Sequence, residues 1–385
     1  MKHVLEPIHC DPWMLDPEIT YLNHGSFGAR VVPVFEYQEE LKQEFERSPV
    51  HFLDRQHYRL EDARKTVSTF LGADVDGFGF VDNATTGIGC VVQSLSFKKG
   101  DEILTSSLVY NGVRQLLSRI AGDSSCSYKE FDIALPVLDC SVILQSLVDA
   151  ITDNTKLLVI DHVASASAII FPVDEIVTIC KEKGVLVLID GAHAPGMLDL
   201  DINRIDADWY VGNLHKWVCA PIGAGFVYAS KRQRECTHPM TVSHGYGQGF
   251  TKEFDWQGSK DLSPWIASAK AVEWGTEIGW DRIREHNHAL AVAMHDALID
   301  AWGVPNISPC NGSMLGTMAT VLLPNACPQD MEGCLQFRDQ LYHEYNIEVP
   351  VFELQGKGVL RISAQLYTQE SHIYRLLRAI ENLTT

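Results

Sequence analysis

The sequence lacks the marks of several protein classes. Its ten cysteines include no Cys-x-x-Cys pair, so neither a zinc site nor a dithiol redox motif is expected. No apolar stretch reaches the roughly 18 residues that a membrane-spanning helix needs. The first residues contain no apolar segment typical of a secretory signal. We therefore expect a cytoplasmic protein with reduced thiols, no metal and no membrane partner.

Positive charge is also scarce. Lysine and arginine number 31 against 50 acidic residues, and the formal net charge is −19. Such a surface disfavours nucleic acid, whose phosphates need basic partners. The glycines at 77–79 and 87–89 do not form the Gly-x-Gly-x-x-Gly pattern of a nicotinamide dehydrogenase. What remains is an acidic globular chain of 385 residues, long enough for one large core and a smaller domain.

Two segments carry recognisable chemistry. The apolar run Gly184–Ile189 ends in Asp190, which predicts a buried parallel strand with an acid at its carboxyl end, where open α/β sheets bind ligands. A second short strand, 208–212, leads to Lys216. A lysine facing a buried acid suits pyridoxal phosphate (PLP), because the lysine forms a Schiff base and the acid keeps the pyridine nitrogen protonated.

These segments and three further motifs together resemble one known family. Their order and spacing are similar to the class V aminotransferase fold of PLP enzymes, and most similar to its isopenicillin N epimerase-like branch, which includes ergothioneine-type C–S lyases. That resemblance implies an α/β, type I PLP-dependent transferase fold with a mostly parallel, seven-stranded sheet. The motifs are Tyr21–Gly28, Asn83–Gly87, Asp190–Gly196, Gly212–Trp217 and Gly223–Val227.

The same resemblance predicts three parts of the chain. Residues 1–30 would close on the active site, residues 31–262 would form the large PLP-binding domain, and residues 263–385 a small α/β domain. From Gly79 onward, apolar runs alternate with amphipathic stretches, which favours a parallel sheet covered by helices. In the last part we expect a strand over 347–352 and a helix over 331–345.

The family's phosphate contacts fall on several positions of this sequence. Ala84 and Thr85 open a predicted helix, whose amino end can hold a phosphate. Asn213 and His215 match further phosphate-side positions. Ser259 matches a position that reaches the phosphate from a second subunit, which implies a homodimer with shared active sites.

Other positions are expected around the cofactor ring. Asp190 matches the partner of the pyridine nitrogen, and His193 would lie near the phenolic oxygen. Tyr110 falls where the family places an aromatic or histidine over the ring, although an aromatic that only packs at a helix start is an equal alternative. Ser165 stands where relatives carry an asparagine, so the hydrogen bond there departs from the family pattern.

Substrate contacts are expected from both ends of the chain. Arg361 lies in an apolar strand and matches the residue that binds the substrate's α-carboxylate; a structural ion pair is the alternative. Asn23, His24 and Ser26 match a loop that closes on a small amino-acid substrate. Arg55 is expected to contact a distal group of the substrate.

The motifs bind the cofactor without choosing the reaction. Our first hypothesis is epimerase-like proton transfer at Cα, for which Lys216 would serve one face and His24 or Tyr110 the other. A C–S β-lyase acting on a cysteine conjugate or sulfoxide is the alternative, and an aminotransferase stays open. A cysteine desulfurase is disfavoured, because the nearest cysteine upstream of Arg361 is Cys334, 27 positions away.

Overall fold

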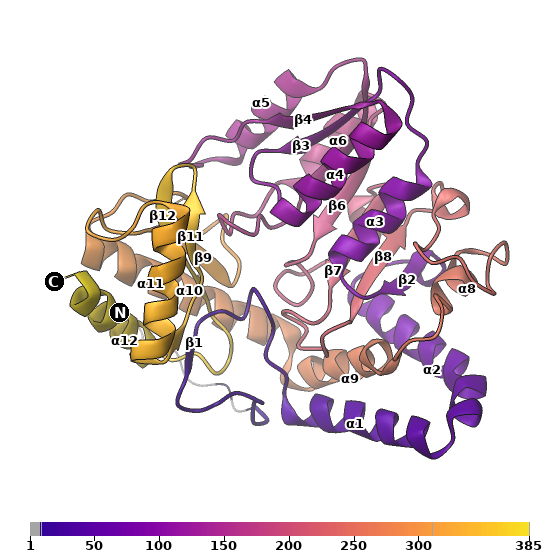
Figure 1. Ribbon diagram of the computed structural model, residues 1–385, viewed down its shortest axis with the longest axis horizontal. Coiled ribbons are helices and arrows are strands. Elements are labelled where there is room, and N and C mark those ends of the chain that lie inside the picture. The colour runs from indigo at the N-terminus through magenta and orange to yellow at the C-terminus, as the bar shows by residue number, and fades with distance from the viewer. Residues whose placement is uncertain (1–7, 9, 310, 385) are drawn as a thin grey trace.

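A seven-stranded sheet forms the centre of the molecule. The computed structural model describes residues 8, 10–309 and 311–384. The strands are β2 (Phe78–Val81), β3 (Glu102–Ser106), β4 (Ser127–Phe131), β5 (Thr155–Asp161), β6 (Leu186–Gly191), β7 (Trp209–Asn213) and β8 (Gly225–Ala229). Their order across the sheet is β2-β8-β7-β6-β5-β3-β4 (Figure 1). Strand β8 runs antiparallel to both of its neighbours, β2 and β7, whereas the other neighbouring pairs are parallel, which confirms the expected mostly parallel sheet.

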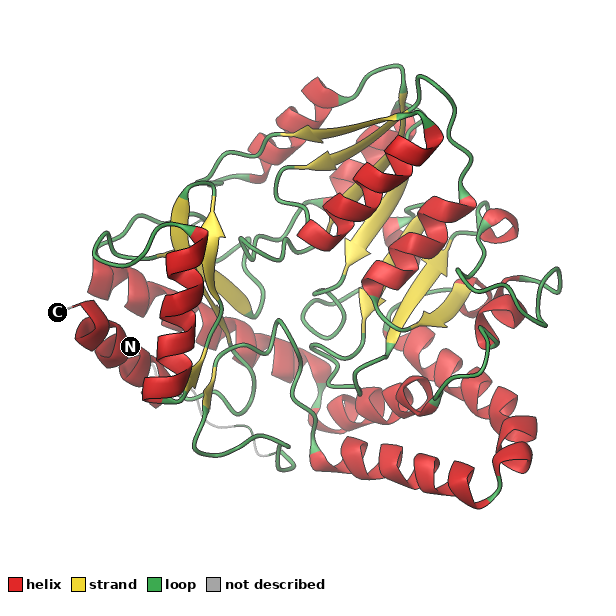
Figure 2. Cartoon of the chain, in the orientation of Figure 1, coloured by secondary structure: helices red, strands yellow, loops and turns green. Residues whose placement is uncertain are grey.

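Apolar side chains of each strand are divided between the two faces of this sheet. In β5, Leu157 and Val159 join the apolar cluster on one face, whereas Leu158 and Ile160 join the cluster on the other. Successive side chains of a strand point in opposite directions, so a continuous apolar run becomes buried on both sides. Helices therefore flank the sheet (Figure 2). They are α3 (Ala84–Ser94), α4 (Asn111–Ser124) and α8 (Phe250–Asp255) with the first cluster, and α1 (Val32–Arg47), α2 (Pro49–Phe70), α5 (Cys140–Ala150), α6 (Val173–Glu182), α7 (Ile202–Ile205) and α9 (Ser263–Ile278) with the second.

A smaller unit has its own sheet and apolar core. Its antiparallel strands are ordered β11-β12-β9, and residues such as Met294, Val321, Phe337 and Leu376 fill the core between sheet and helices. The elements are α10 (Trp280–Trp302), β9 (Met318–Leu322), α11 (Met331–Tyr345), β10 (Ile347–Glu348), β11 (Val351–Leu354), β12 (Lys357–Ser363) and α12 (Glu370–Thr384).

The amino-terminal segment is attached to this smaller unit. Strand β1 (Thr20–Tyr21) pairs in parallel with β10, and Leu22 belongs to the smaller unit's core. The single strand expected over 347–352 is wrong, because β10 and β11 are separate strands divided at Val349-Pro350. Proline has no amide hydrogen for a ladder and so interrupts the pairing there.

Helix α9 follows the expected boundary at residue 262 but packs on the large unit. Its residues Trp265, Ile266 and Ala271 belong to the cluster that includes the large sheet, and the helix contacts α1 and α2. The core thus continues across residue 262, and the domain boundaries stay a prediction.

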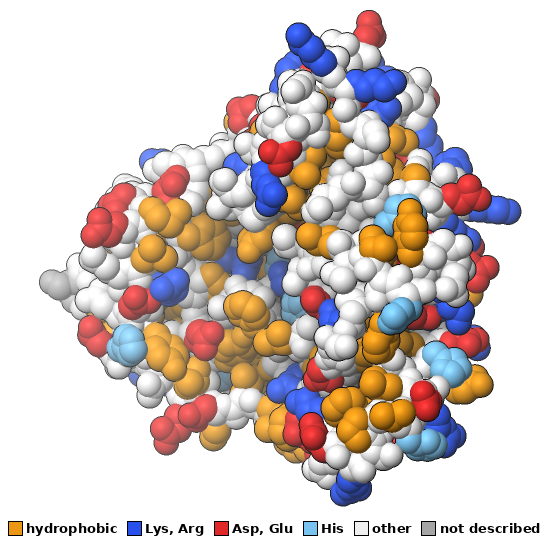
Figure 3. Space-filling model, turned by 45° about the vertical axis from the view of Figure 1, so that its right-hand side comes forward, with side chains coloured by type: hydrophobic (Ala, Val, Ile, Leu, Met, Phe, Trp, Pro, Cys, Tyr) orange, Lys and Arg blue, Asp and Glu red, His pale blue; other side chains and the backbone are white. Residues whose placement is uncertain are grey.

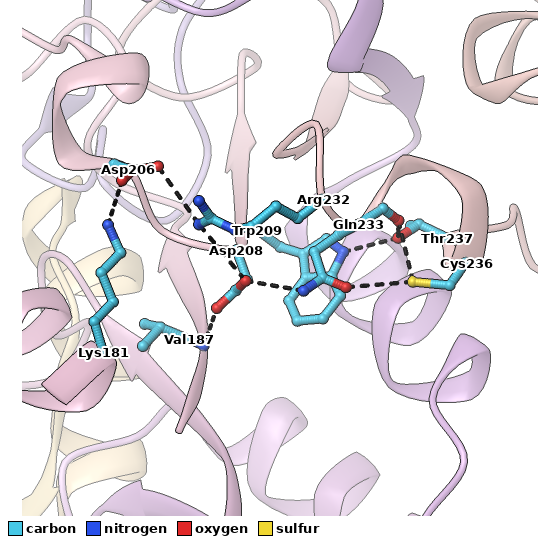
Figure 4. A network of polar contacts seen from close by, with 9 residues as sticks. All are labelled: Lys181, Val187, Asp206, Asp208, Trp209, Arg232, Gln233, Cys236 and Thr237. Atoms are coloured by element: carbon cyan, nitrogen blue, oxygen red, sulfur yellow. Dashed lines mark hydrogen bonds and ion pairs between the residues drawn. The ribbon is translucent and has the colours of Figure 1, made fainter. Parts of the chain in front are cut away.

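A polar network fixes the register of β6 and β7 at the edge where both strands begin (Figure 4). The buried Asp208 carboxylate accepts the Val187 amide at 3.0 Å and the Gln233 side-chain amide at 2.9 Å. The Trp209 indole nitrogen donates to Thr237 at 2.8 Å. Because the strands are locked at this edge, their opposite ends deliver Asp190 and Lys216 to one place.

Two negative findings apply to the described part of the chain. No helix there is both long and apolar enough to cross a membrane. No group of three or more metal-ligating side chains comes together among the same residues.

Candidate active site

The candidate site lies where the parallel strands end. Asp161 and Asp190 are register partners at the ends of β5 and β6, and Asn213 ends β7 three residues before Lys216. Carboxyl ends of parallel strands share one edge of a sheet, so these groups converge. The space-filling view shows a hollow between the large and the smaller unit, with basic and histidine side chains inside it (Figure 3).

The Lys216 amine is held in the interior of the site. Its Nζ lies 3.1 Å from Nε2 of His193. Burial, then the charge of Arg361, lowers the pKa of Lys216 from 10.5 to about 7, against an opposing effect of Asp190. Burial also lowers the pKa of His193 well below its ordinary value, so that ring is neutral. A large fraction of the amine is therefore unprotonated near neutral pH and can act as a nucleophile or base.

Two neighbouring carboxylates share the sheet edge. Asp190 is 4% exposed and accepts the Ala192 amide at 2.9 Å. Asp161, which sequence reasoning missed, is 3% exposed and has one oxygen without a hydrogen-bond partner among the described residues. Burial raises the pKa of both, and the charge of Asp190 raises that of Asp161 further, well above its usual value. We interpret Asp161 as the protonated member and Asp190 as the ionised one.

The amino end of α3 offers an anion-binding amide. The Ala84 amide donates to Asn213 at 2.8 Å, and the Thr86 amide donates to its own N-cap, Asn83, at 2.9 Å. The Thr85 amide between them has no acceptor within the described structure, and the helix dipole adds positive potential at this end. His215 is fixed nearby through Nδ1, which donates to the Ala224 carbonyl at 3.0 Å.

Arg361 is a buried cation that has no carboxylate partner in the part of the chain that the structure describes. Its Nη1 donates to the Ser165 carbonyl at 2.6 Å and to Ser165 Oγ at 3.1 Å, and its Nη2 donates to Ser26 Oγ at 2.8 Å. The Nε atom is buried without an acceptor in the described residues. No structural ion pair of Arg361 exists among the described residues, and the guanidinium fork remains available for a carboxylate.

The expected acid–base role of His24 is not supported by the geometry. The ring is fully buried, Nε2 lies 3.1 Å from the Lys216 carbonyl and Nδ1 lies 3.0 Å from the Tyr367 hydroxyl. Burial lowers the pKa of His24 to about 3. Both ring nitrogens are engaged inside the protein, so neither is directed at a substrate. From the same loop, Asn23 accepts the Ser26 amide at 3.0 Å through its backbone carbonyl.

Three other expected residues lie at the surface of the chain. Tyr110 is 51% exposed at the amino end of α4. Ser259 is exposed and lines a groove of about 500 Å³ together with residues of α1 and α2. Arg55 is exposed on α2, and no contact in the described part of the chain brings it to Lys216 or Arg361, so its assignment to a distal substrate group is not supported.

The arrangement fits PLP. The free Thr85 amide suits a phosphate, the ionised Asp190 suits a protonated pyridine nitrogen, and His193 keeps one buried nitrogen, Nδ1, without a partner in the described region. Lys216 is a depressed-pKa amine beside them. The residues that would hold the cofactor are therefore of the chemical types that PLP requires.

Comparisons with known proteins agree with this interpretation. The model of the aminotransferase class-V family matches residues 31–376. The chain is 30% identical to an isopenicillin N epimerase of Amycolatopsis lactamdurans over 96% of both sequences. It is 32% identical to an L-cysteine desulfhydrase of Arabidopsis thaliana, covering 95% of this chain and 88% of the other. A C-DES mutant with glycine covalently linked to its PLP cofactor has the same fold, with a TM-score of 0.83, 19% identity, and coverage of 94% of this chain and 96% of that one.

Proposed function

The chain belongs to the class V aminotransferase family of PLP enzymes, and on that premise we propose that it is a C–S β-lyase acting on L-cysteine or an S-substituted cysteine. In this proposal Lys216 carries the cofactor, Asp190 holds its pyridine nitrogen, and the Thr85 amide contacts its phosphate. Arg361 binds the substrate's α-carboxylate. The cofactor supplies an electron sink for the pair released when the Cα–H bond breaks.

The chain's own groups then complete the reaction. Lys216 accepts the Cα proton, and the Cβ–S bond breaks with the electron pair leaving on sulfur as a thiolate. Addition of water to the remaining three-carbon unit gives pyruvate and ammonia. For L-cysteine the balance is cysteine plus water to pyruvate, ammonia and hydrogen sulfide.

The observation that carries this choice is the placement of His24. An epimerase needs an acid–base group on each face of Cα. Both ring nitrogens of His24, the histidine expected on the second face, form hydrogen bonds inside the protein, with the Lys216 carbonyl and the Tyr367 hydroxyl. Elimination needs only one base and a leaving group. The desulfhydrase relative supports the same direction.

Epimerisation is kept as a second candidate on one observation. Tyr110 follows β3 at the sheet edge where Lys216 lies, and its phenol is half exposed. A phenol over the opposite face of Cα would supply the second proton. The epimerase relative supports this alternative.

A desulfurase stays disfavoured. Cys334 is fully buried in α11 and its thiol donates to the Pro328 carbonyl. No cysteine lies between it and Arg361, so the stretch that leads to the substrate arginine supplies no thiol.

One assay separates the candidates. The purified protein with PLP is incubated in deuterium oxide with L-cysteine, S-substituted cysteines and a non-sulfur amino acid. Pyruvate released with a thiol or sulfide, and no inverted amino acid, is the expected result. Deuterium at Cα of recovered, racemising substrate without pyruvate would replace the lyase by the epimerase.

We further propose a homodimer with shared sites that works in the cytoplasm. The exposed position of Ser259 beside a groove supports a second copy on that face. The nine cysteines in the described residues are all free thiols, which supports a reducing compartment.

A further inference from the structure

The loop that contains His24 is clamped onto the backbone of Lys216. His24 Nε2 lies 3.1 Å from the Lys216 carbonyl oxygen, and Gly28 lies against the same oxygen. A Cβ at Gly28 would approach that oxygen to 2.2 Å, so only glycine fits. The Gly28 amide also donates to the His215 carbonyl at 3.2 Å. Two positions of one loop therefore hold the peptide that carries the lysine.

The hydrogen-bond pattern fixes the proton on the His24 ring. The Ala29 amide can only donate, and it does so to Nδ1 at 3.3 Å. The Lys216 carbonyl can only accept, and it faces Nε2. Both demands are met when the ring is neutral with its proton on Nε2, and the Tyr367 hydroxyl then donates to Nδ1. An imidazolium would direct an N–H at the Ala29 N–H.

The opposite tautomer satisfies fewer partners. The Gln365 amide nitrogen lies 3.3 Å from Nε2 of His24. It could donate a hydrogen bond there only if Nε2 carried a lone pair, as it does in the opposite tautomer. Its oxygen is held by the Asn287 side chain and the Leu366 amide, which fixes the orientation of the amide. The same nitrogen has Cys219 Sγ as an alternative acceptor at 3.8 Å, so it does not require the His24 lone pair.

The surroundings hold the ring rigidly. The Trp217 ring packs on His24 with centroids 4.9 Å apart, and Trp13 and Tyr367 complete the enclosure. Tyr367 and Gln365 come from the chain just after β12, so the clamp joins the amino-terminal loop, the lysine loop and the smaller unit.

We infer that His24 is a positioning residue: as a neutral, Nε2-protonated imidazole it fixes the Lys216 carbonyl and thereby the place of the Lys216 amine. Displacing a reacting group by about 1 Å can cost about a hundredfold in rate. This inference rests on the proposed role of Lys216. It gives His24 a function in the reaction without contact to substrate.

Two substitutions separate the two ring nitrogens. His24→Gln places an amide nitrogen near the position of Nε2 and keeps the donor to Lys216. His24→Asn places an amide oxygen near the position of Nδ1 and loses that donor. Tyr367→Phe serves as the control, because it removes only the hydroxyl that donates to Nδ1.

Three readouts are compared: the rate at which acetic anhydride labels Lys216 in the apoprotein, the pH titration of the PLP absorbance band, and kcat against KM. We expect His24→Gln and Tyr367→Phe to stay within about threefold of the parent in all rates, and His24→Asn to lower kcat by about thirtyfold or more with KM unchanged. Only His24→Asn should change the rate at which acetic anhydride labels Lys216, and only this variant should shift the pH titration of the PLP absorbance band.

Equal effects of His24→Gln and His24→Asn, or a parent-like His24→Asn, would overturn the inference. If His24→Asn does not fold, the nitrogen NMR shifts of the His24 ring in the parent protein provide the test. A charged or Nδ1-protonated His24 at pH 7 would contradict the inference. A parent protein without a PLP band would instead refute the proposed function, and the labelling comparison would still test His24.

Discussion

Arg361 donates a 2.6 Å hydrogen bond from Nη1 to the backbone carbonyl of Ser165. The guanidinium thus connects β12 of the smaller unit to the loop that follows β5 of the large sheet. Replacing Arg361 with alanine should lower kcat/KM about 10²- to 10³-fold, because the carboxylate loses a two-pronged charged partner. Arg361→Lys should lose less, since the charge remains without the fork. The measurement is steady-state kinetics with the PLP absorbance band as a check of cofactor loading.

The exposed Arg338 provides a matched control. Among the described residues it forms an ion pair with the neighbouring Asp339 on the surface, so Arg338→Ala should leave kcat/KM unchanged. Loss of the PLP band in Arg361→Ala would argue for a structural role instead of substrate binding.

Conversion into asparagine should reduce activity far more at Asp190 than at Asp161. Asp161→Asn imitates the protonated acid that we assign there, and activity should fall by less than about tenfold. Asp190→Asn removes the charge that holds the pyridine nitrogen, and activity should fall at least about a hundredfold. Absorbance scans and kcat are compared for both variants. Equal losses of activity would contradict this assignment of the proton to Asp161 and of the negative charge to Asp190.

Much of this arrangement was predictable from local sequence. Helix α11 begins and ends as expected because Asp330 caps it, accepting the Gly333 amide at 2.9 Å, and Asn346 stops it in the left-handed region with φ 54°. The apolar run that ends in Asp190 and the short strand that leads to Lys216 likewise predicted, from neighbouring residues alone, that both side chains lie at the sheet edge. Such signals lie within a few residues of the feature that they predict.

Other features depend on distant partners. The unpredicted strand β4 has only Phe131 buried, because an edge strand needs no apolar run. Asp161 ends an apolar run as Asp190 does, so the same local signal in the sequence marks its position. His24 looked like an acid–base group, and the partners that occupy its nitrogens include Lys216 and Tyr367, which lie 192 and 343 positions away in the sequence.

Lys216 should make the apoprotein more stable as the pH rises. Its pKa is about 7 in the folded protein and 10.5 ordinarily, so between these values the unfolded chain binds more protons and folding becomes more favourable with increasing pH. At pH 6.5, Lys216→Met should raise the free energy of unfolding by roughly 2–4 kcal/mol, because a buried charge is removed.

Urea denaturation of both apoproteins at pH 6.5 and pH 9.5 tests this. The gain from Lys216→Met should shrink at the higher pH, where the folded parent already carries a neutral amine beside Asp190, His193 and Arg361. A gain that is constant with pH would show that the effect comes from packing.

Removal of the Cys334 thiol should leave the reaction intact. In Cys334→Ser, pyruvate formation from L-cysteine should stay within about twofold of the parent, although the buried hydroxyl should lower stability by about 1 kcal/mol. If the parent protein instead forms alanine from L-cysteine and releases no sulfide, the reaction follows a persulfide mechanism. Sulfide, pyruvate and alanine are quantified in the same reaction.

Two inactive variants should restore activity when their subunits are exchanged. Ser259→Asp puts a negative charge at the position expected to reach the partner's phosphate, and Lys216→Ala removes the Schiff-base lysine. In a mixed dimer, the site built on Lys216 of the first variant receives the intact Ser259 of the second. Equal mixing makes about half of the dimers mixed, each with one complete site, so about a quarter of parental activity should return. Mixing after mild denaturation and renaturation, with each variant treated alone as the control, measures this. Because neither variant can complete a site by itself, activity that appears only in the mixture requires residues from two chains, whereas no recovery in mixtures shown by mass to contain mixed dimers would place each site within one chain.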